Sequence, residues 1–415
     1  MRAKIEGGLS SMSNNEQSSA LKVHKLTFWE AAMIVVGANI GSGILGLAYS
    51  SRKAGWPILL MWLIVAGVFT TFSMLYVAET TLRTEKPMQL PGLADRYVGK
   101  LGAILVFISV AANSIGCMIA YMSGSGRILA ALLGIPNQMG SLIFAVPAII
   151  VVWLGLKATG VAEKIISTGM MVMVGVIIAA SFLSDKANVN GAIYTNWTYA
   201  VPVFNVAIFC YIAQYAVPEM ARGLRHDPKK LAPAIVMGMF LTAVLLALVP
   251  LAVISLTGPE KVTEVATIAW GDALGKWAFF VANIFALCAM MTSYWAVGGS
   301  FLTNIVDMFH FKDETNFFTR LISVILVCVP PFYLAYSGMV GFVDAIYLAG
   351  TFGGVIMSIL PVMMLRGARE SGDVEPEWKC GWYSAGWVQT LLIVLFCGAA
   401  VYAIFDLMGM LPKAW

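Results

Sequence analysis

The chain has 415 residues, of which 60% are hydrophobic and only 12% are charged. Soluble domains usually contain about 25% charged residues, so this composition excludes a soluble or a disordered protein and indicates a polytopic membrane protein. The net charge of +4 is small and the sequence has no basic stripe, which argues against nucleic acid as a partner.

The first 26 residues are polar and lack the apolar core and cleavage site of a signal peptide, so we predict a disordered cytoplasmic tail over residues 1–26. None of the six cysteines forms a CxxC pair, which argues against a zinc site or a disulfide framework. The stretch Gly41–Gly46 satisfies the GxGxxG pattern but follows no strand, so we predict no organic cofactor.

Eleven apolar stretches follow, each long enough to cross a bilayer as a helix of about 20 residues. A barrel strand is about half that length, so the predicted fold is all-α. The stretches are 27–52, 56–82, 101–133, 138–156, 161–184, 198–222, 231–256, 276–309, 318–336, 339–366 and 385–408.

Lysine and arginine are distributed unequally over the two sides of these spans. With the N-terminus in the cytoplasm, 19 of the 26 basic residues lie in cytoplasmic segments, 6 lie in external segments and Arg127 lies within a span. Basic residues favour the cytoplasmic side, so we predict a plasma-membrane protein with its N-terminus inside. Eleven spans then place residues 409–415 outside.

Two spans contain residues that interrupt a helix. The first has three glycines between residues 37 and 43, and the sixth has Pro218, which lacks a backbone donor. Each opens a block of five spans, 27–184 and 198–366, which leaves 385–408 as an extra helix. Because five is odd, the second block must cross the membrane inverted. Inverted repeats with broken helices are typical of secondary transporters.

The interrupted first span exposes peptide groups that a ligand can satisfy. The amides of Ser42 and Gly43 lie at a helix N-terminus and suit a carboxylate. The carbonyls near Gly37 and Ile40 lie at a helix C-terminus and suit a cation or an ammonium group. The alternative is that Gly37 and Gly41 form a small-xxx-small packing motif.

The eighth span contains two adjacent hydroxyls, Thr292 and Ser293, one turn after Ala289. Together with a nearby carbonyl they can supply oxygen ligands to a hard cation. The alternative is that the hydroxyls only bond back to carbonyls of their own helix.

These residues resemble the amino acid/auxin permease family of the amino acid–polyamine–organocation superfamily, and within it the bacterial aromatic amino acid permeases. The resemblance covers nearly all eleven spans and implies the leucine-transporter-like fold, with a central L-amino acid site. The residues that carry it are Gly37–Leu47, Lys53–Pro57, Val217 with Pro218, Thr292 with Ser293 and Asp307, and Gly341–Pro361.

The resemblance also implies roles for individual residues. The α-carboxylate would meet the amides of Gly41, Ser42 and Gly43. The α-ammonium would meet carbonyls near Ala38 and Asn39 and those of residues 210–213, which include Cys210, Tyr211 and Ala213. In sodium-coupled relatives a cation lies between the first and eighth spans, which here implies Na+ held by the carbonyls of Gly37, Ile40 and Ala289 and the hydroxyls of Thr292 and Ser293.

The side-chain pocket is predicted to be formed by Tyr121, Tyr211, Gln214 and Tyr215, although aromatic residues at helical spacing are often ordinary packing. Gln214 departs from the family, where histidine is frequent. The small side chains of Cys117 and Ala213 leave room for a bulky neutral substrate.

Three charged residues are candidate gates. Asp344 could pair with Arg52 near the outer face, and Glu219 could carry a proton or pair with Arg222. In proton-coupled relatives a buried lysine on the fifth span can replace sodium. Here Lys164 lies at the end of that span, which favours sodium over proton coupling.

The sequence therefore predicts a secondary active transporter that imports a neutral, bulky or aromatic L-amino acid with Na+ by alternating access, as a monomer or weak oligomer. Proton coupling and an amino acid sensor on a transporter scaffold are the alternatives. No paired carboxylates, Ser/His couple or metal cluster lies at membrane depth, so we do not expect an enzyme.

Overall fold

The computed structural model describes residues 25–154, 160–308 and 316–415. Within these ranges the chain is helical, with no β-strand. Nine helices in the described ranges are long and apolar enough to span a membrane, and two short helices bent by 53° at a break form a tenth span. The fifth predicted span falls on α8 (Gly160–Phe182). Its segment Met171–Phe182 is apolar but shorter than a membrane span, so a total of eleven spans remains a prediction.

The helices begin and end close to the predicted limits of the spans. In chain order they are α2 (Phe28–Asn39) with α3 (Ser42–Ser51), α4 (Trp56–Leu82), α6 (Lys100–Leu133), α7 (Asn137–Leu154), α8, α9 (Ala200–Phe209) with α10 (Val217–Gly223), α11 (Leu231–Thr257), α13 (Lys276–Met308), α14 (Phe317–Tyr336), α15 (Phe342–Leu348) with α16 (Val355–Ser371), and α17 (Gly386–Leu407).

Local sequence explains several of these limits. Thr27 and Glu30 form a capping box that starts α2. Pro57 lies in the first turn of α4, where its missing N–H is not needed. Gly134 ends α6 in the left-handed conformation, with φ of 69°.

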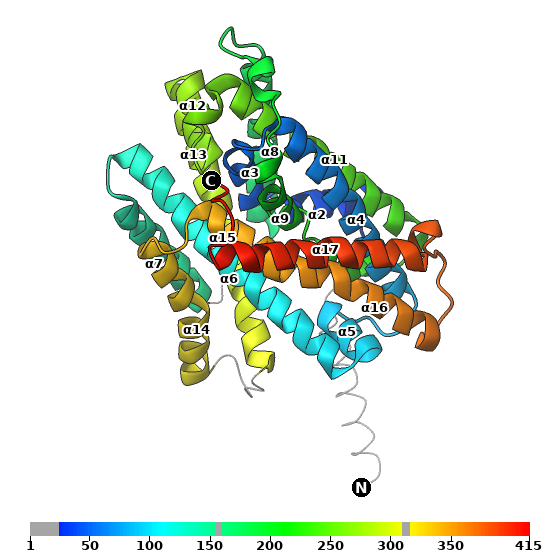
Figure 1. Cartoon of the computed structure of the whole chain (residues 1–415). Helices are drawn as coiled ribbons and strands as arrows, with labels where there is room; N and C mark the ends of the chain where they lie inside the picture. The colour runs from blue at the N-terminus through cyan, green and yellow to red at the C-terminus, as the bar shows by residue number, and fades with distance from the viewer. Residues whose placement is uncertain (1–24, 155–159, 309–315) are drawn as a thin grey trace.

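Successive spans run in opposite directions, which defines two faces. The N face holds the start of α2 and the connections 83–99, 224–230 and 372–385. The C face holds the connections 52–55, 183–199, 258–275 and 337–341 and the residues after α17. Two short helices that the span analysis did not predict, α5 (Leu90–Val98) and α12 (Ala266–Leu274), lie at these opposite ends of the molecule (Figure 1).

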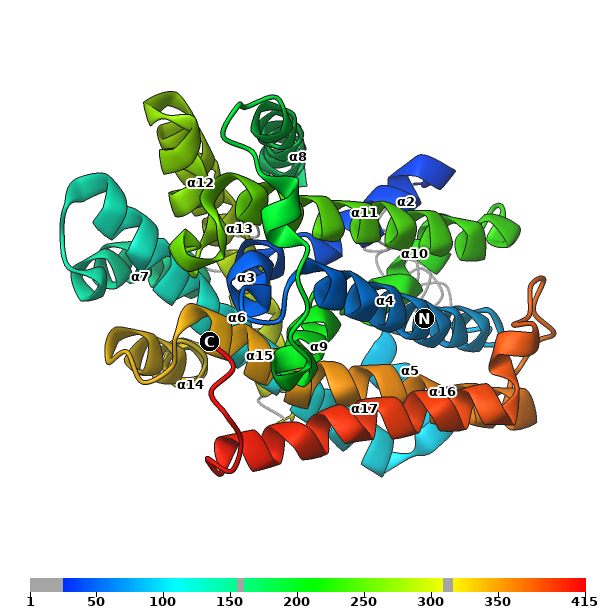
Figure 2. The same cartoon turned by 45° about the horizontal axis from the view of Figure 1, so that its top comes forward.

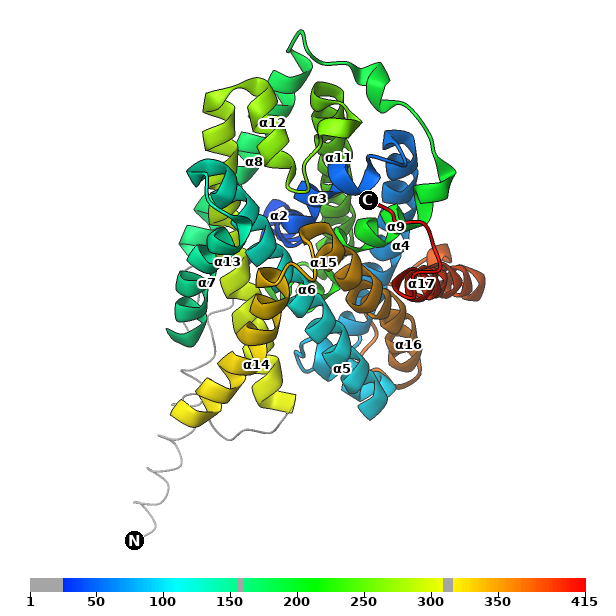
Figure 3. The same ribbon diagram turned by 60° about the vertical axis from the view of Figure 1, so that its left-hand side comes forward.

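The chain after α17 lies on the C face, opposite the start of α2. Which face is cytoplasmic remains the prediction made from the basic residues. The long connection between α8 and α9 runs over the C face (Figure 3). It is attached there by hydrogen bonds from the Tyr194 hydroxyl to the Arg52 carbonyl and from the Asn196 amide to the Ala54 carbonyl.

The tenth span lies inside the bundle, while α17 packs along its outer side (Figure 2). Between α15 and α16 the span contains a π-helical stretch, Ala349–Gly354. Glycines allow this stretch to approach its neighbours closely: a Cβ added at Gly353 would lie 2.9 Å from the Cβ of Asn113 on α6. This packing fixes the position of α6 beside the centre of the molecule.

Candidate functional site

The first span is broken at its middle. Helix α2 ends at Asn39, α3 begins at Ser42, and the two helices are inclined by 53°. The Gly41 amide donates to the Asn39 carbonyl at 3.1 Å, which replaces the regular bond to the Gly37 carbonyl. The glycine-rich sequence therefore interrupts the helical hydrogen-bond ladder, as predicted.

The break leaves backbone carbonyls and amides, which carry opposite partial charges, without backbone hydrogen-bond partners. Within the described chain, no backbone hydrogen bond reaches the carbonyls of Gly37, Ala38 and Ile40, and none is donated by the amides of Ser42 and Gly43. The carbonyls carry partial negative charge at the end of α2, and the amides carry partial positive charge at the start of α3. A zwitterion is the kind of ligand that matches both.

The glycines of this break differ in their surroundings. A Cβ added at Gly37 would meet no atom within 4 Å, and one added at Gly41 would meet only the Tyr121 hydroxyl at 3.7 Å. The small-xxx-small packing alternative therefore does not describe this pair. Gly43 is the glycine of this break that packs closely, because a Cβ added to it would lie 2.6 Å from the Cys210 sulfur.

The sixth span is also broken. Helix α9 ends at Phe209, α10 begins at Val217, and Gln214–Ala216 forms a single 3₁₀ turn between them. Pro218 lies in the first turn of α10, so the proline begins the second half of the span. The contact between Gly43 and Cys210 brings the two breaks together at the centre of the molecule.

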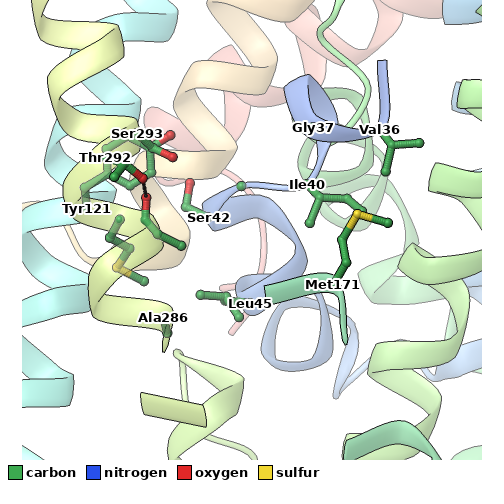
Figure 4. Close-up of a pocket in the computed structure, with 13 residues that line it drawn as sticks. Val36, Gly37, Ile40, Ser42, Leu45, Tyr121, Met171, Ala286, Thr292 and Ser293 are labelled. Carbon is green, nitrogen blue, oxygen red and sulfur yellow. Dashed lines mark hydrogen bonds between the residues drawn. The ribbon is translucent and has the colours of Figure 1, made fainter. Parts of the chain in front are cut away.

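A small cavity of about 610 Å³, including the solvent at its mouth, lies between the first break and α13 (Figure 4). Its wall contains every residue predicted to hold a cation, which are Gly37, Ile40, Ala289, Thr292 and Ser293. In Figure 4, Thr292 and Ser293 come from one side and Gly37 and Ile40 from the other.

The oxygen atoms around this cavity are not all free. Thr292 donates its hydroxyl to the Ala289 carbonyl at 3.0 Å and the Cys288 carbonyl at 3.2 Å, which is the back-bonding alternative. A hydroxyl that donates in this way keeps its lone pairs, so it can still coordinate a cation. The Ser42 hydroxyl, also in the wall, is buried and has no hydrogen-bond partner among the described residues. The ligand prediction did not include it.

A larger cavity, about 1610 Å³ including solvent, extends from the first break toward the N face, where Gln89, Glu219 and Asn304 line it. The predicted substrate residues in its wall are Ala38, Asn39, Gly41, Ser42, Cys117 and Tyr121. Gly41, Ser42 and Tyr121 line both cavities, so a ligand at the break and an ion beside it would share a wall.

Other predicted substrate residues lie outside both cavities. Cys210, Ala213 and Gly43 are buried where the two breaks pack together. Tyr211 is buried and directs its ring toward Gly67 of α4. The Gln214 amide is buried without a hydrogen-bond partner among the described residues. The side chains of Tyr211, Ala213 and Gln214 therefore line neither cavity, whereas the predictions for Gly43 and Cys210 concern their backbone groups.

The residues of the sixth span that do line the large cavity are Phe209, Ile212, Tyr215 and Glu219. The non-helical residues between α9 and α10 change the direction of successive side chains, so helical spacing does not predict which of them face inward. Only the general position of the break was readable from the sequence.

The predicted pair of Arg52 and Asp344 does not form. Arg52 donates to the Tyr49 hydroxyl at 3.1 Å and lies over its ring. Asp344 accepts from the Trp415 indole at 2.7 Å and from the Gly341 amide at 3.3 Å. Each group has local partners instead, although the Arg52 Nε is buried without a hydrogen bond, and no ion pair joins Arg52 and Asp344 among the described residues.

The C face has a different ion pair, between Arg127 and Glu264 at 2.8 Å. Burial raises the pKa of Glu264, and the neighbouring Arg127 opposes that rise. At the N face, Glu219 lies 3.8 Å from Arg222 and is largely exposed, in agreement with the i+3 pair considered from the sequence.

The sequence model of the tryptophan/tyrosine permease family matches residues 24–405. A tyrosine-specific transport system of Haemophilus influenzae is 24% identical over 392 residues, covering 90% of this chain and 95% of the relative. A tryptophan-specific transport protein of the same organism is 25% identical over 368 residues, covering 82% of this chain and 87% of the relative.

A solved structure is similar over nearly the whole chain. The manganese transporter of Eremococcus coleocola, crystallised with an aromatic bis-isothiourea compound, superposes with a TM-score of 0.59. It is 14% identical and covers 95% of this chain and 93% of that one. At this identity the likeness concerns the fold alone.

The matching family differs from the amino acid/auxin permease family that the sequence resembles. The two readings agree on an amino acid permease with aromatic amino acid transporters among its relatives.

Proposed function

The chain belongs to the tryptophan/tyrosine permease family, and from that premise we propose that it is a secondary transporter for aromatic L-amino acids. This is a family of transport proteins, not enzymes, and the chain is a multi-pass membrane transporter. The relatives are described as specific for tyrosine or tryptophan. We extend that substrate class to this chain.

The observation that carries the proposal is the pair of unpartnered amides and carbonyls at the break of the first span. The substrate carboxylate would accept from the amides of Ser42 and Gly43, and the ammonium group would donate to the Ala38 carbonyl. The Gly41 amide is already used in a local turn, so we assign the carboxylate two amides instead of three.

We further propose that the fold is the leucine-transporter-like arrangement of two inverted repeats, 27–184 and 198–366, with α17 added. The meeting of the two broken spans supports this assignment. In such a fold the first, second, sixth and seventh spans would rock against the others and expose the site to each side in turn.

Sodium is the coupling ion that we propose. The small cavity offers carbonyl and hydroxyl oxygens, and no charged side chain lines it among the described residues. The described residue of α8 in its wall is the apolar Met171. Lys164, the basic residue considered for proton coupling, lies outside the described side chains.

One sodium ion is energetically sufficient for concentrative uptake. Its passage across about 100 mV supplies roughly 2.3 kcal/mol. A tenfold gradient adds about 1.4 kcal/mol, and together these sustain roughly 500-fold accumulation of substrate. We therefore propose that the protein works in an energised plasma membrane and moves its substrate inward, toward the side of the N-terminus.

Uptake of labelled tryptophan and tyrosine into proteoliposomes tests the proposal. We expect accumulation under an imposed sodium gradient and little under a proton gradient alone. Accumulation driven equally by protons without sodium would replace the sodium assignment with proton coupling. Binding without counterflow of labelled substrate would identify a sensor instead of a transporter.

Thr292→Val tests the ion site separately. Loss of the hydroxyl removes one oxygen ligand, which is worth about 1.5 kcal/mol or more, so half-maximal uptake should require at least about tenfold more sodium. Thr303→Val is the matched control, because Thr303 lies on the same helix, bonds back to Gly299 and lines neither cavity. An unchanged sodium requirement in Thr292→Val would exclude this residue as a ligand.

A further inference from the structure

The large cavity has one wall formed by a single face of α6. Its residues in that wall are Val106, Val110, Asn113, Ser114, Cys117 and Tyr121. Apart from the adjacent pair Asn113 and Ser114, successive residues of this set are three or four positions apart, which places them on one face of the helix. Because α6 starts at the N face, this face leads from the first break toward the mouth of the cavity.

Depth along α6 follows from helix geometry. The Tyr121 hydroxyl lies beside Gly41 at the break. Side chains of a helix lean toward its N-terminus, so this hydroxyl lies near the level of Cys117. Asn113 comes four residues earlier, about 6 Å nearer the N face. That offset is similar to the reach from the backbone of an aromatic amino acid to the far edge of its ring.

Much of the wall opposite α6 is apolar. Phe209 and Ile212 come from the broken sixth span, and Ala296 and Val297 come from α13, one turn beyond the hydroxyls of the ion cavity. A flat ring fits between such surfaces without a polar partner. A ring-borne N–H or O–H does not, because a buried donor without an acceptor costs about 1–3 kcal/mol.

The Asn113 amide makes no hydrogen bond with any described residue, although its side chain lines the cavity. Its backbone is held by the close approach of Gly353, and the Ser109 hydroxyl one turn earlier donates to the Gly353 carbonyl at 2.6 Å. Asn113 is therefore a polar group in a fixed position that lacks an internal partner.

Tryptophan and tyrosine share a feature that phenylalanine lacks, which is a hydrogen-bond donor on the ring. The amide oxygen of Asn113 can accept from an indole N–H or a phenol O–H, and its NH₂ group can also donate to the phenol oxygen. We propose that Asn113 is the specificity-determining residue that recognises this donor, and so selects tryptophan and tyrosine over phenylalanine. The assignment rests on the proposed transport of aromatic amino acids.

Competition against labelled tryptophan uptake by tryptophan, tyrosine and phenylalanine tests the assignment. In Asn113→Leu, which has similar shape without the polar atoms, we expect inhibition by tryptophan and tyrosine to weaken at least tenfold. Inhibition by phenylalanine should remain within about twofold of wild type. Asn113→Asp keeps an acceptor and should retain most of the preference for tryptophan over phenylalanine.

A substrate analogue separates recognition from packing. Tryptophan methylated at its indole nitrogen cannot donate, so the wild type should discriminate against it and Asn113→Leu should not. Equal weakening for all ligands, or an unchanged preference, would overturn the role of Asn113.

Two control variants locate the effect. Asn304 lies at the mouth of the same cavity, and its amide already donates to the Ser300 carbonyl at 2.8 Å. Asn304→Leu should therefore not alter the preference for tryptophan and tyrosine over phenylalanine. Loss of preference in Ser114→Ala, with Asn113→Leu unaffected, would assign recognition to the neighbouring serine. If the wild type binds no aromatic amino acid, the proposed function itself is wrong.

Discussion

The two faces of the molecule are closed to different degrees. At the C face the centre is sealed: α3 packs against α15 through Gly46, whose added Cβ would lie 3.1 Å from Ile346 and 3.3 Å from Phe342. The Arg127–Glu264 ion pair joins α6 to the connection before α12. The Trp415 ring packs against Tyr347, which brings the chain after α17 over the same region.

At the N face the centre is hollow and the rim is held together. The large cavity reaches this face. Glu79, at the end of α4, is fully buried and does not line the cavity. Its carboxylate accepts from Arg83, from Arg369 at the end of α16 and from the Cys380 amide, all within 2.7–2.9 Å. We call Glu79, Arg83 and Arg369 the rim cluster.

Under the proposed function, this difference gives the substrate site access from the N face. Small residues and one ion pair close the C face, and these contacts can separate without unfolding any helix. The ion pairs of the rim cluster join α4 and α16 away from the residues that line the cavity. In the proposed transport cycle, the cavity would open and close at the N face while α4 and α16 stay joined.

Glu79→Gln should have the largest effect, and it acts on stability. The variant leaves two arginines beside a buried group that no longer carries negative charge, which costs about 3 kcal/mol. We expect a clearly lower melting temperature in detergent. Glu377→Gln, an exposed glutamate in the connection before α17, is the control and should melt like wild type. Equal melting of the two variants would show that the rim cluster does not hold the N face.

Gly46→Leu should open the C face. Overpacking between α3 and α15 costs about 1–3 kcal/mol, so the equilibrium constant for closing the C face should fall about five- to 150-fold. The readout is labelling of Ser300→Cys, which lines the large cavity toward the N face, in a background without other cysteines. Labelling should slow in proportion to the loss of the closed state, by up to that factor. Gly398→Leu is the control, since an added Cβ there meets nothing within 4 Å.

The Arg127–Glu264 ion pair should contribute less, because both side chains remain partly exposed, at 32% and 20%. A pair of this kind is worth about 1 kcal/mol, which corresponds to roughly a fivefold change. We expect Arg127→Met to slow Ser300→Cys labelling by up to that factor, because it leaves the Glu264 carboxylate without its partner. Adding Glu264→Gln should restore part of the labelling rate, since it removes the unpaired charge. No change on adding Glu264→Gln to Arg127→Met would indicate that the two residues act independently of each other.

The smallest effect should be a pH dependence of the closed C face. Burial raises the pKa of Glu264 above its ordinary value of 4.5, with Arg127 opposing the rise and Asp344 adding to it. When the C face is closed, Glu264 therefore binds a proton more readily than a solvated glutamate does. Closure should strengthen as pH falls toward 4.5 and weaken as pH rises through the raised pKa. The ratio of Ser300→Cys labelling to that in a Glu264→Gln background should follow this trend.

Much of the fold could be predicted because it depends on properties local in sequence. The length of an apolar stretch predicts a spanning helix, and the helices lie within a few residues of the predicted spans. Glycine near residue 41 and Pro218 predict where helices are interrupted, since each acts on its own backbone. The predicted cation residues Gly37, Ile40, Thr292 and Ser293 also share one cavity, but their grouping came from the resemblance to a known family and not from a local property of the chain.

Only the tertiary structure decided which side chains meet between distant helices. Arg127 pairs with a glutamate 137 residues away, and Asp344 binds Trp415 instead of the predicted Arg52. Tyr211 and Gln214 turn away from the cavity because the irregular break rotates them out of helical phase. The rotation and tilt of each helix depend on packing against all of its neighbours at once, and no local pattern of residues records that outcome.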